Sequence, residues 1–407
     1  MNIFIIPSWY PSHENTLNGV FILEQTSALA TLYPGINFGI SLWGQNDERY
    51  LLHANQPLRA LKKLMASHHR KGKKRKDNLV EFFSPAYSYT SRINRGNIAG
   101  KIKACENNLQ EFERLFGKAD VIHAHVTYPA GHIAAQLSAR HSIPYVLTEH
   151  MTPFPQKYHL QKPGVLKPGL TRALNQADRV IAVSRALKKR ILTFGISNAV
   201  EVIPNFIARG MFQSSPKASH PVFTFVTVCG LHLAKGLEEM LKAIKMVISE
   251  DENFAFIIVG DGPHKARLKK LSQALSLSQY VRFEGFQSRE RIPGFYAKAD
   301  AHILVSSNES FGVVYIEAMA SGIPSIAHAV GGPLDILDED TGVFVESLDP
   351  RLIADKMLWM KKNHHKFDSR KIMARYEQKF SPAAVAPRIV EMYRSILPGS
   401  QTGPNKS

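Results

Sequence analysis

Two glutamates eight positions apart are the residues of this sequence that most directly suggest chemistry. Glu309 lies in an expected loop after a strand that ends near Val305, and Glu317 lies on the helix that begins near Gly312. Two carboxylates at this spacing can accept hydrogen bonds from a sugar and from a ribose on either side of a diphosphate. Between them, the backbone N–H groups at the helix start can bind an anion or a hydroxyl; they belong to the stretch Ser310, Phe311, Gly312, Val313. The alternative is an acid that stabilises the helix dipole beside a surface glutamate.

A lysine and three glycines in neighbouring expected loops fit the same ligand. Lys235 stands at an expected helix start, where a cation is unfavourable unless an anion binds there; the alternative is a lysine that faces solvent. Gly230, Gly260 and Gly262 each follow an expected strand, where the missing Cβ lets a ligand approach the backbone. Lys265 stands where a third glycine would complete a dinucleotide fingerprint, which disfavours an NAD enzyme.

Histidines at strand ends are the candidates in the first half of the chain. His150 follows the expected strand 145–148; a resemblance described below makes it our first choice for a catalytic residue. His123 and His125 lie at the end of the expected strand 121–124, and we expect them to have a structural role there. No third ligand clusters with them, so we expect no metal site. Gly19, at an expected helix start, would let the backbone approach a diphosphate or an acceptor closely.

Short Ile- and Val-rich runs alternate with amphipathic stretches along the chain, which predicts parallel sheets with helical crossovers. In the first half we expect strands at 3–6, 36–41, 121–124, 145–148, 179–182 and 201–203, and helices at 19–32, 98–116, 130–141, 169–175 and 184–194. In the second half we expect strands at 224–228, 255–259, 281–284, 301–305 and 325–327, and helices at 235–249, 264–275, 312–320 and 382–396. Ser184 is a plausible N-cap.

This pattern predicts an α/β protein with two Rossmann-like, doubly wound parallel sheets. A stretch rich in Ser, Pro and Ala without apolar period separates them. We expect a first domain over 1–205, joined by a C-terminal helix at about 382–397, a second domain over 206–381 and a disordered tail over 398–407. Ligands of such sheets bind at the carboxyl ends of the strands, so we look for the chemistry in a cleft between the two domains.

Composition limits the remaining possibilities. The 407 residues are 44% hydrophobic, include only Cys105 and Cys229, and contain no apolar run near the length of a membrane span. The formal net charge is +17, and nine Lys or Arg lie between Arg59 and Lys76 without an acid. This segment suits anionic lipid headgroups or diphosphates, and the alternative is a solvated, mobile loop. No nucleic-acid-binding signature accompanies the charge. We expect a cytoplasmic protein that is peripheral at the inner face of the cell membrane.

The stretch from Glu309 to Pro324 resembles the signature of the retaining glycosyltransferases of family four: two glutamates with seven residues between them, Phe-Gly between, and Glu-Ala-Met-Ala-x-Gly-x-Pro following. The resemblance implies a GT-B fold and covers nearly the whole chain apart from the basic segment and the tail. Further matching segments are Pro7–Pro11, Asn18–Phe21, Thr148–His150, Asp178–Ser184, Val202–Asn205, Gly230–Gly236, Gly260–Pro263, Phe283–Phe286 and Gly331–Pro333.

The resemblance assigns roles to these residues. Glu309 and Lys235 contact the donor sugar and diphosphate, His150 lies beside the donor sugar, and Phe286 lies on the nucleobase side. Gly230 stands where the family usually has an arginine, so one cationic phosphate contact is missing. Gly331 and the residue after it would lie near the donor sugar, or would simply form a tight turn.

The resemblance implies a retaining, metal-independent transfer from a UDP- or GDP-sugar, with no cofactor. The implied acceptor is lipid-linked (a polyprenyl diphosphate) or a saccharide, in the biosynthesis of a bacterial O-antigen, capsule or exopolysaccharide. Two other functions stay open: a nucleotide-sugar 2-epimerase, and a non-catalytic protein that binds nucleotide sugars or anionic lipids.

Overall fold

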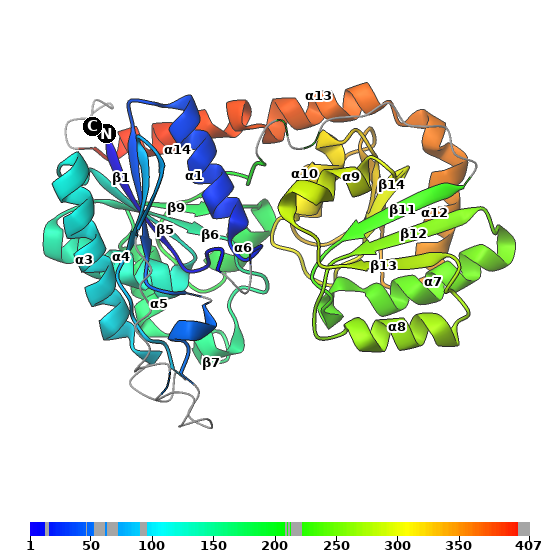
Figure 1. The fold of residues 1–407 in the computed structure, drawn as a ribbon, viewed down its shortest axis with the longest axis horizontal. Coiled ribbons are helices and arrows are strands. Elements are labelled where there is room, and N and C mark those ends of the chain that lie inside the picture. The colour runs from blue at the N-terminus through cyan, green and yellow to red at the C-terminus, as the bar shows by residue number, and fades with distance from the viewer. Residues whose placement is uncertain are drawn as a thin grey trace. The chain divides into compact units, whose positions relative to one another are not determined.

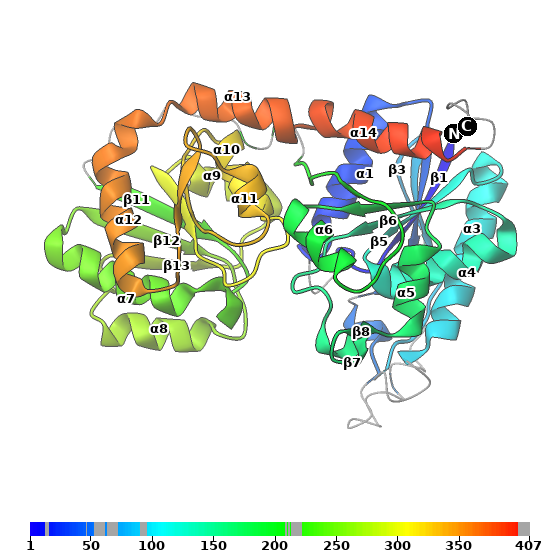
Figure 2. The same ribbon diagram turned by 180° about the vertical axis from the view of Figure 1, so that it is seen from behind.

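The computed structural model describes residues 1–12, 16–45, 47–52, 62, 72–89, 96–207, 210, 212 and 222–397. The chain divides into two compact units. The first comprises Met1–Val183, Lys188–Ile203 and Val385–Ser407, and the second comprises Ser184–Leu187 and Pro204–Ala384. The expected tail 398–407 and most of the expected linker lie outside the described residues. Each unit is an α/β sandwich around a parallel sheet, as the sequence pattern predicted (Figures 1 and 2).

The sheet of the first unit has eight strands in the order β10-β9-β6-β5-β1-β2-β4-β3. These strands are β1 (Asn2–Pro7), β2 (Asn37–Leu42), β3 (Lys73–Lys76), β4 (Leu79–Phe83), β5 (Val121–His125), β6 (Tyr145–Glu149), β9 (Arg179–Ala182) and β10 (Val200–Val202). All neighbours pair in parallel except β3, which runs antiparallel to β4 at the edge. The central strands β1, β5 and β6 are buried along almost their whole length, which explains why apolar residues dominate them.

Helices cover both faces of this sheet. They are α1 (Val20–Leu32), α3 (Ile98–Phe116), α4 (His132–His141), α5 (Pro168–Asn175), α6 (Arg185–Leu192) and α14 (Pro382–Ser395). Short elements complete the unit: 3-10 turns at Glu48–Tyr50 and Lys157–His159 and a hairpin of β7 (Leu160–Lys162) and β8 (Val165–Leu166). In α3, apolar residues at helical spacing (102, 105, 109, 112) face the sheet. The Ser184 hydroxyl accepts a hydrogen bond from the Leu187 N–H, which confirms Ser184 as the N-cap of α6.

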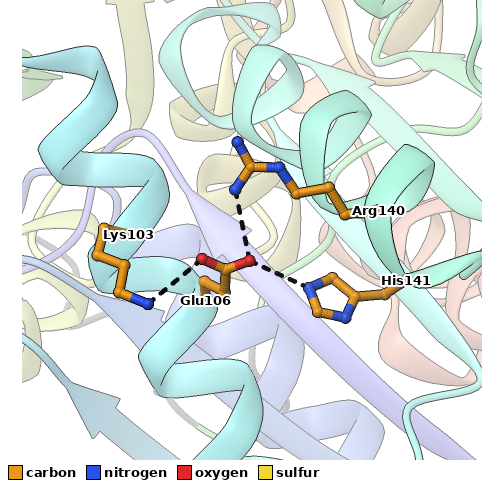
Figure 3. A network of polar contacts seen from close by, with 4 residues as sticks. All are labelled: Lys103, Glu106, Arg140 and His141. Atoms are coloured by element: carbon orange, nitrogen blue, oxygen red, sulfur yellow. Dashed lines mark hydrogen bonds and ion pairs between the residues drawn. The ribbon is translucent and has the colours of Figure 1, made fainter.

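One polar network joins two of these helices on the surface (Figure 3). The Glu106 carboxylate, on α3, lies 3.6 Å from the Lys103 Nζ and 3.4 Å from both Arg140 and His141 on α4. Burial on its own would raise the pKa of Glu106, but hydrogen bonds from His141 and Arg140 hold that pKa below its ordinary value. The network ties α3 to α4 without reaching the strand ends.

The sheet of the second unit has six strands in the order β13-β12-β11-β14-β15-β16. They are β11 (Phe223–Val228), β12 (Phe254–Val259), β13 (Val281–Gly285), β14 (Ala301–Leu304), β15 (Ser325–His328) and β16 (Gly342–Val345). The helices are α7 (Leu237–Glu250), α8 (Lys265–Ala274), α9 (Ile292–Tyr296), α10 (Val313–Ala320), α11 (Pro333–Ile336), α12 (Pro350–Asn363) and α13 (Ser369–Phe380). Figure 1 shows α7 and α8 on one side of the sheet and α9 and α10 on the other. All pairs are parallel, so every carboxyl strand end lies at one edge.

The structure contains elements that the sequence pattern did not predict, among them β4, β16, α12 and α13. It also changes our interpretation of the basic segment, for which we considered a solvated loop. Its residues Lys73–Lys76 form the exposed edge strand β3, in which Arg75 pairs with Glu81 on β4. The remaining described basic residue is Lys62, and Arg59, Lys63, Arg70 and Lys71 lie outside the described residues.

Candidate active site

The predicted donor residues of the second unit lie in loops at one edge of its sheet. Gly230 and Lys235 follow β11, Gly260 and Gly262 follow β12, and Phe286 follows β13. Glu309, Ser310, Phe311 and Gly312 lie between β14 and α10, and Val313 is the first residue of α10. Since parallel strands place their carboxyl ends on the same side, these loops are neighbours.

An ion pair connects two of the predicted catalytic residues. The Lys235 Nζ lies 2.8 Å from the Glu309 Oε2, and the two side chains are only 21% and 10% exposed. The Ser307 N–H also donates to the Ala234 carbonyl oxygen at 2.8 Å, which holds the two loops together. Lys235 is thus not a solvent-facing lysine: it places one positive charge beside the Glu309 carboxylate near the start of α10.

The loop after β15 fixes the backbone around Glu309. Gly331 has a φ of +68°, and a Cβ there would lie 2.0 Å from the Glu309 carbonyl oxygen. The Gly332 N–H donates to that same oxygen at 2.9 Å. A Cβ on Gly332 would meet the Cα of Phe311 at 2.3 Å. Both glycines are therefore needed for close backbone packing against the Glu309 loop.

The second glutamate of the pair has a different environment. Glu317 is 2% exposed, and its carboxylate forms an ion pair with Arg289. The Tyr296 hydroxyl donates to the Glu317 Oε2 at 3.0 Å, and the Arg289 guanidinium lies 5.1 Å from the centre of the Phe212 ring. Burial, and after it the Glu317 charge, raises the pKa of Tyr296 well above its ordinary value, so that phenol stays a donor.

The glycine loops pack on one another. A Cβ on Gly260, whose φ is +138°, would lie 1.9 Å from the Cys229 carbonyl oxygen, and one on Gly262 would lie 2.6 Å from that of Leu231. These glycines join the loops after β11 and β12. Phe286, by contrast, is 49% exposed. Gly230 is exposed beside His232, whose Cδ2 would be 2.9 Å from an added Cβ.

Neither thiol is set up as a nucleophile. Burial raises the pKa of Cys105 to about 12 and that of Cys229 to about 11. Both therefore stay protonated at neutral pH, as expected for inert core thiols.

In the first unit, the structure brings His150 together with a residue that we had assigned a structural role. The His125 Nδ1 lies 3.0 Å from the His150 Nε2, and the rings stack with centroids 5.3 Å apart. Burial lowers the pKa of His125 to about 3, so its ring is neutral. His123 instead bonds to the Tyr393 hydroxyl on α14 at 2.6 Å and to Thr148 at 2.8 Å. His125 thus fixes the ring plane of His150.

A buried carboxylate holds the backbone beside His150. Glu149 is fully buried; its Oε1 accepts from the His150 and Met151 N–H groups at 2.8 Å each, and its Oε2 accepts from the N–H and hydroxyl of Thr127. Burial raises the pKa of Glu149, although these hydrogen bonds oppose the shift. Val126, a β-branched residue, is held at a φ of +76° next to this cluster. Strained backbone of this kind concentrates at functional sites.

Close backbone packing in the structure explains why residue 19 is a glycine. It is the N-cap of α1 with a φ of +70°, and an added Cβ would lie 2.3 Å from the Trp9 carbonyl oxygen. The close approach that the sequence predicted is therefore made by the backbone of the same unit. Its predicted approach to a ligand stays a prediction.

Sequence reasoning missed the partners of the predicted residues: Arg289, Tyr296, Thr127 and Glu149. Glu149 directly precedes His150 in the sequence, and a charged residue at the end of an apolar strand could have marked it as a partner of His150. Arg289 lies 28 positions from Glu317, and only the crossover from β13 to β14 brings the two together.

Within the described residues, no cluster of three or more His, Cys, Asp or Glu could hold a metal ion. In the same residues, no helix is both long and apolar enough to cross a membrane.

Comparisons with known proteins agree with this geometry. Residues 65–209 match the sequence model of Glycosyltransferase Family 4, and residues 211–380 match that of Glycosyl transferases group 1. The two matched regions are thus glycosyltransferase domains of these families, and together they make up most of the chain. The two family domains make the chain a transferase enzyme, and its structure has the two Rossmann-like domains of the GT-B fold.

Three of the curated relatives act on lipids according to their names. A phosphatidylinositol N-acetylglucosaminyltransferase gpi3 subunit of Schizosaccharomyces pombe is 26% identical, over 55% of this chain and 50% of the relative. An alpha-monoglucosyldiacylglycerol synthase of Streptococcus pneumoniae is 24% identical over 51% and 52%. A GDP-mannose-dependent phosphatidylinositol monomannoside mannosyltransferase of Mycolicibacterium smegmatis is 30% identical over 46% and 53%. The chain thus spans about half the length of these relatives.

Solved structures match over nearly the whole chain. The sucrose-phosphate synthase of Thermosynechococcus elongatus has a TM-score of 0.73 at 18% identity, covering 97% of this chain and 99% of that one. HepE of Anabaena, solved in complex with UDP, has a TM-score of 0.70 at 20% identity, covering 97% and 100%. At 18% and 20% sequence identity, this similarity shows that the chain has the same fold as these two proteins.

Proposed function

We propose that this enzyme transfers a glycosyl unit from a nucleotide-sugar donor to an acceptor hydroxyl, with retention of the anomeric configuration and without a metal ion. The Lys235–Glu309 ion pair beside the α10 start carries the proposal. It supplies an ammonium for the donor diphosphate and a carboxylate for sugar hydroxyls within one compact group. The solved relative HepE, in complexes with UDP and with UDP-glucose, supports a UDP-sugar as the donor class.

The proposed reaction breaks the bond between the anomeric carbon and the diphosphate oxygen and forms one from that carbon to the acceptor oxygen. Negative charge grows on the departing phosphate, where Lys235 and the N–H groups of Phe311, Gly312 and Val313 stabilise it. The acceptor attacks on the face that the phosphate leaves, and the phosphate oxygen takes the acceptor proton. No step needs an enzymatic nucleophile.

The second glutamate is proposed to bind the ribose. An ionised carboxylate has about four lone-pair positions, so Glu317 can keep its bonds to Arg289 and Tyr296 and still accept from ribose hydroxyls. The exposed ring of Phe286 is proposed to pack on the nucleobase. Arg289, paired with Glu317, thereby positions the ribose-binding carboxylate.

His150 is proposed to bind a hydroxyl of the donor sugar from the first unit. His125 orients its ring, and Glu149 fixes the backbone at His150 and Met151. An imidazole held in one plane can hydrogen-bond to a sugar hydroxyl without losing orientation entropy during the reaction.

We further propose that the acceptor is lipid-linked or a saccharide, and that the enzyme works at the cytoplasmic face of a membrane in surface-polysaccharide synthesis. The lipid acceptors in the names of three relatives support this setting. The basic strand β3 also supports it, since its four side chains are exposed. Replacing the nine basic residues from Arg59 to Lys76 by serine should abolish co-sedimentation with anionic vesicles; unchanged binding would remove the membrane role.

The decisive experiment measures release of nucleoside diphosphate from UDP-, GDP-, ADP- and dTDP-sugars, with membrane extract as acceptor source and EDTA present. We expect release from one donor and its loss in Glu309→Ala, with full activity in the control Glu111→Ala on the surface of α3. The anomeric configuration of the product is read by NMR. Release that depends on an added metal ion would contradict the metal-independent mechanism. A 2-epimeric sugar, either free or still attached to the nucleotide, would indicate an epimerase, and donor binding without release or epimerisation would indicate a non-catalytic protein.

A further inference from the structure

Histidine rings of the first unit form a buried row that ends at His150. His123 and His125 lie two positions apart on β5 and therefore on the same face of the sheet. Their ring centroids are 4.2 Å apart with an angle of 31° between the planes, and the His125 Nδ1 lies 3.0 Å from the His150 Nε2. His123 and His125 are each 1% exposed, and His150 is 6% exposed. The row thus runs from the interior of the unit to the ring that is proposed to bind the donor sugar.

A tyrosine of α14 anchors the other end of this row. Tyr393 is fully buried, and its hydroxyl oxygen lies 2.6 Å from the His123 Nδ1. The second ring nitrogen of His123, Nε2, lies 2.8 Å from the Thr148 Oγ1. Burial raises the pKa of Tyr393, and burial, with a smaller effect of the neighbouring histidines, lowers the pKa of His123. Both groups are therefore neutral, and whichever nitrogen of His123 carries the proton, both nitrogens are hydrogen-bonded. Two bonds at opposite sides of the ring fix its plane.

Loss of the Tyr393 hydroxyl would reach His150 through the ring contacts. It would leave the His123 Nδ1 buried without its hydrogen bond, which favours rotation of that ring toward another partner. The centroid distance of 4.2 Å between His123 and His125 is shorter than the range of about 4.5–7 Å in which aromatic pairs are usually found. His123 therefore cannot rotate without displacing His125, and a displaced His125 would change its bond to His150.

The helix that contains the anchor is itself fixed on the sheet of the first unit. The Arg388 Nη2 donates to the Val202 carbonyl oxygen on β10 at 2.6 Å. Ile389 and Val390 of α14 are buried, with exposures of 2% and 1%. Because backbone position and side-chain burial are both set by this packing, Tyr393 is a rigid reference point for the histidine row.

We propose that Tyr393 is a positioning residue for sugar transfer: through the rings of His123 and His125 it holds His150 in the orientation in which that ring meets the donor sugar. This inference rests on the proposed transferase function, and it extends the first-unit site from the strand ends to the C-terminal helix. Tyr393 itself does not touch the substrate.

The test is a double-mutant cycle on the full chain, read as release of nucleoside diphosphate from the donor that turns over. Tyr393→Phe keeps the ring and removes the hydroxyl. We expect it to lower kcat about tenfold, because a small misplacement of a group that contacts the substrate costs about one to two orders of magnitude in rate. The calorimetric affinity for the product nucleotide should not change, since the proposed nucleotide contacts lie in the second unit. In the His150→Ala background, Tyr393→Phe should change kcat by less than about twofold.

Tyr145→Phe is the matched control in the same unit. The Tyr145 hydroxyl is also buried and donates to the Ala173 carbonyl oxygen at 2.8 Å, but Tyr145 is the first residue of β6, at the opposite end of that strand from His150. We expect a comparable fall in melting temperature and an unchanged kcat. An equal loss of kcat from Tyr393→Phe in both backgrounds, or equal losses in the two tyrosine variants, would overturn the positioning role, because the effect would then come from stability.

Imidazole nitrogen NMR spectra of histidine-labelled protein give a second readout that needs no turnover. The signals of His150 are identified by their loss in His150→Ala. We expect Tyr393→Phe to shift these signals and Tyr145→Phe to leave them in place. Unchanged His150 signals in a folded Tyr393→Phe protein would also overturn the inference. Shifted signals in a protein that releases nucleoside diphosphate from no donor would support the contact between the rings and remove the transfer function.

Discussion

At the residue scale, the Lys235–Glu309 pair concentrates charge where the proposed leaving group departs. We expect Lys235→Met to lower kcat about 100-fold or more, because removing one stabilising contact to developing negative charge costs about two to three orders of magnitude. The measurement is steady-state release of nucleoside diphosphate together with calorimetric binding of the product nucleotide.

Lys361→Met is the matched control for this variant. Lys361 forms a similar ion pair with Asp251 at 2.6 Å, and Asp251 lies at the C-terminal end of α7, at the other edge of the sheet from the glycine loops. A loss of activity in both variants would show that ion-pair deletion acts through stability. A loss in Lys235→Met alone supports the catalytic role.

A second residue-scale prediction concerns Gly331. Gly331→Ala should lower both the melting temperature and the activity, because the added Cβ would be 2.0 Å from the Glu309 carbonyl oxygen. Gly195 has the same φ of +68° but nothing within 4 Å of an added Cβ. Gly195→Ala should therefore cost only the left-handed strain of about 1–2 kcal/mol and keep full turnover. Equal effects of the two substitutions on turnover would show that packing against the Glu309 loop does not matter.

At the element scale, the buried carboxylate of Glu317 anchors α10 to the segment that contains α9. Arg289→Met leaves this charge buried without its cation, and we expect a loss of about 3–5 kcal/mol in unfolding free energy. Tyr296→Phe removes one hydrogen bond and should cost about 1 kcal/mol. Urea unfolding of the single variants and of the double variant measures both terms. Simple additivity in the double variant would contradict a shared network.

At the scale of the whole molecule, buried neutral histidines set the pH dependence of stability. Burial lowers the pKa of His125 and His302 to about 3. Each binds a proton in the unfolded chain below about pH 6.5 while the folded state does not. The unfolding free energy should therefore fall as pH drops below 6.5, by about 1.4 kcal/mol per histidine and pH unit.

Urea denaturation at pH 7, 6 and 5 tests this expectation. Carboxyl groups whose pKa is lowered in the folded state, such as Asp338 and Asp251, lose their contribution only near and below pH 4. The loss of stability from pH 7 to 5 therefore reports the histidines, and the raised pKa of buried Glu149 acts in the opposite direction, because its folded state takes up a proton before the unfolded chain does. A denaturation midpoint that does not move in this window would show that the rings take up protons without unfolding.

The sequence by itself determined the two-sheet architecture and the loops in which the proposed donor residues lie. Strands such as 3–6 and 255–259 were found because parallel strands buried on both faces need continuous apolar runs. Glu309, Lys235 and the glycines could be singled out because each lies close in sequence to the end of an expected strand. The order of these short motifs along the chain can be recognised without coordinates. The four-residue strand β16, which consists of Gly-Val-Phe-Val, and the amphipathic helices α12 and α13 were missed.

Only the tertiary structure decided which side chains meet. Arg289 reaches Glu317, Tyr393 reaches His123 across 270 positions, and His125 contacts His150, because strand order and crossovers juxtapose residues far apart in sequence. The burial of His159, whose ring nitrogens have no hydrogen-bond partner among the described residues, was equally invisible, since burial depends on the packing around a side chain and not on its neighbours in the chain. Local pattern specifies elements, whereas partners and burial are properties of packing.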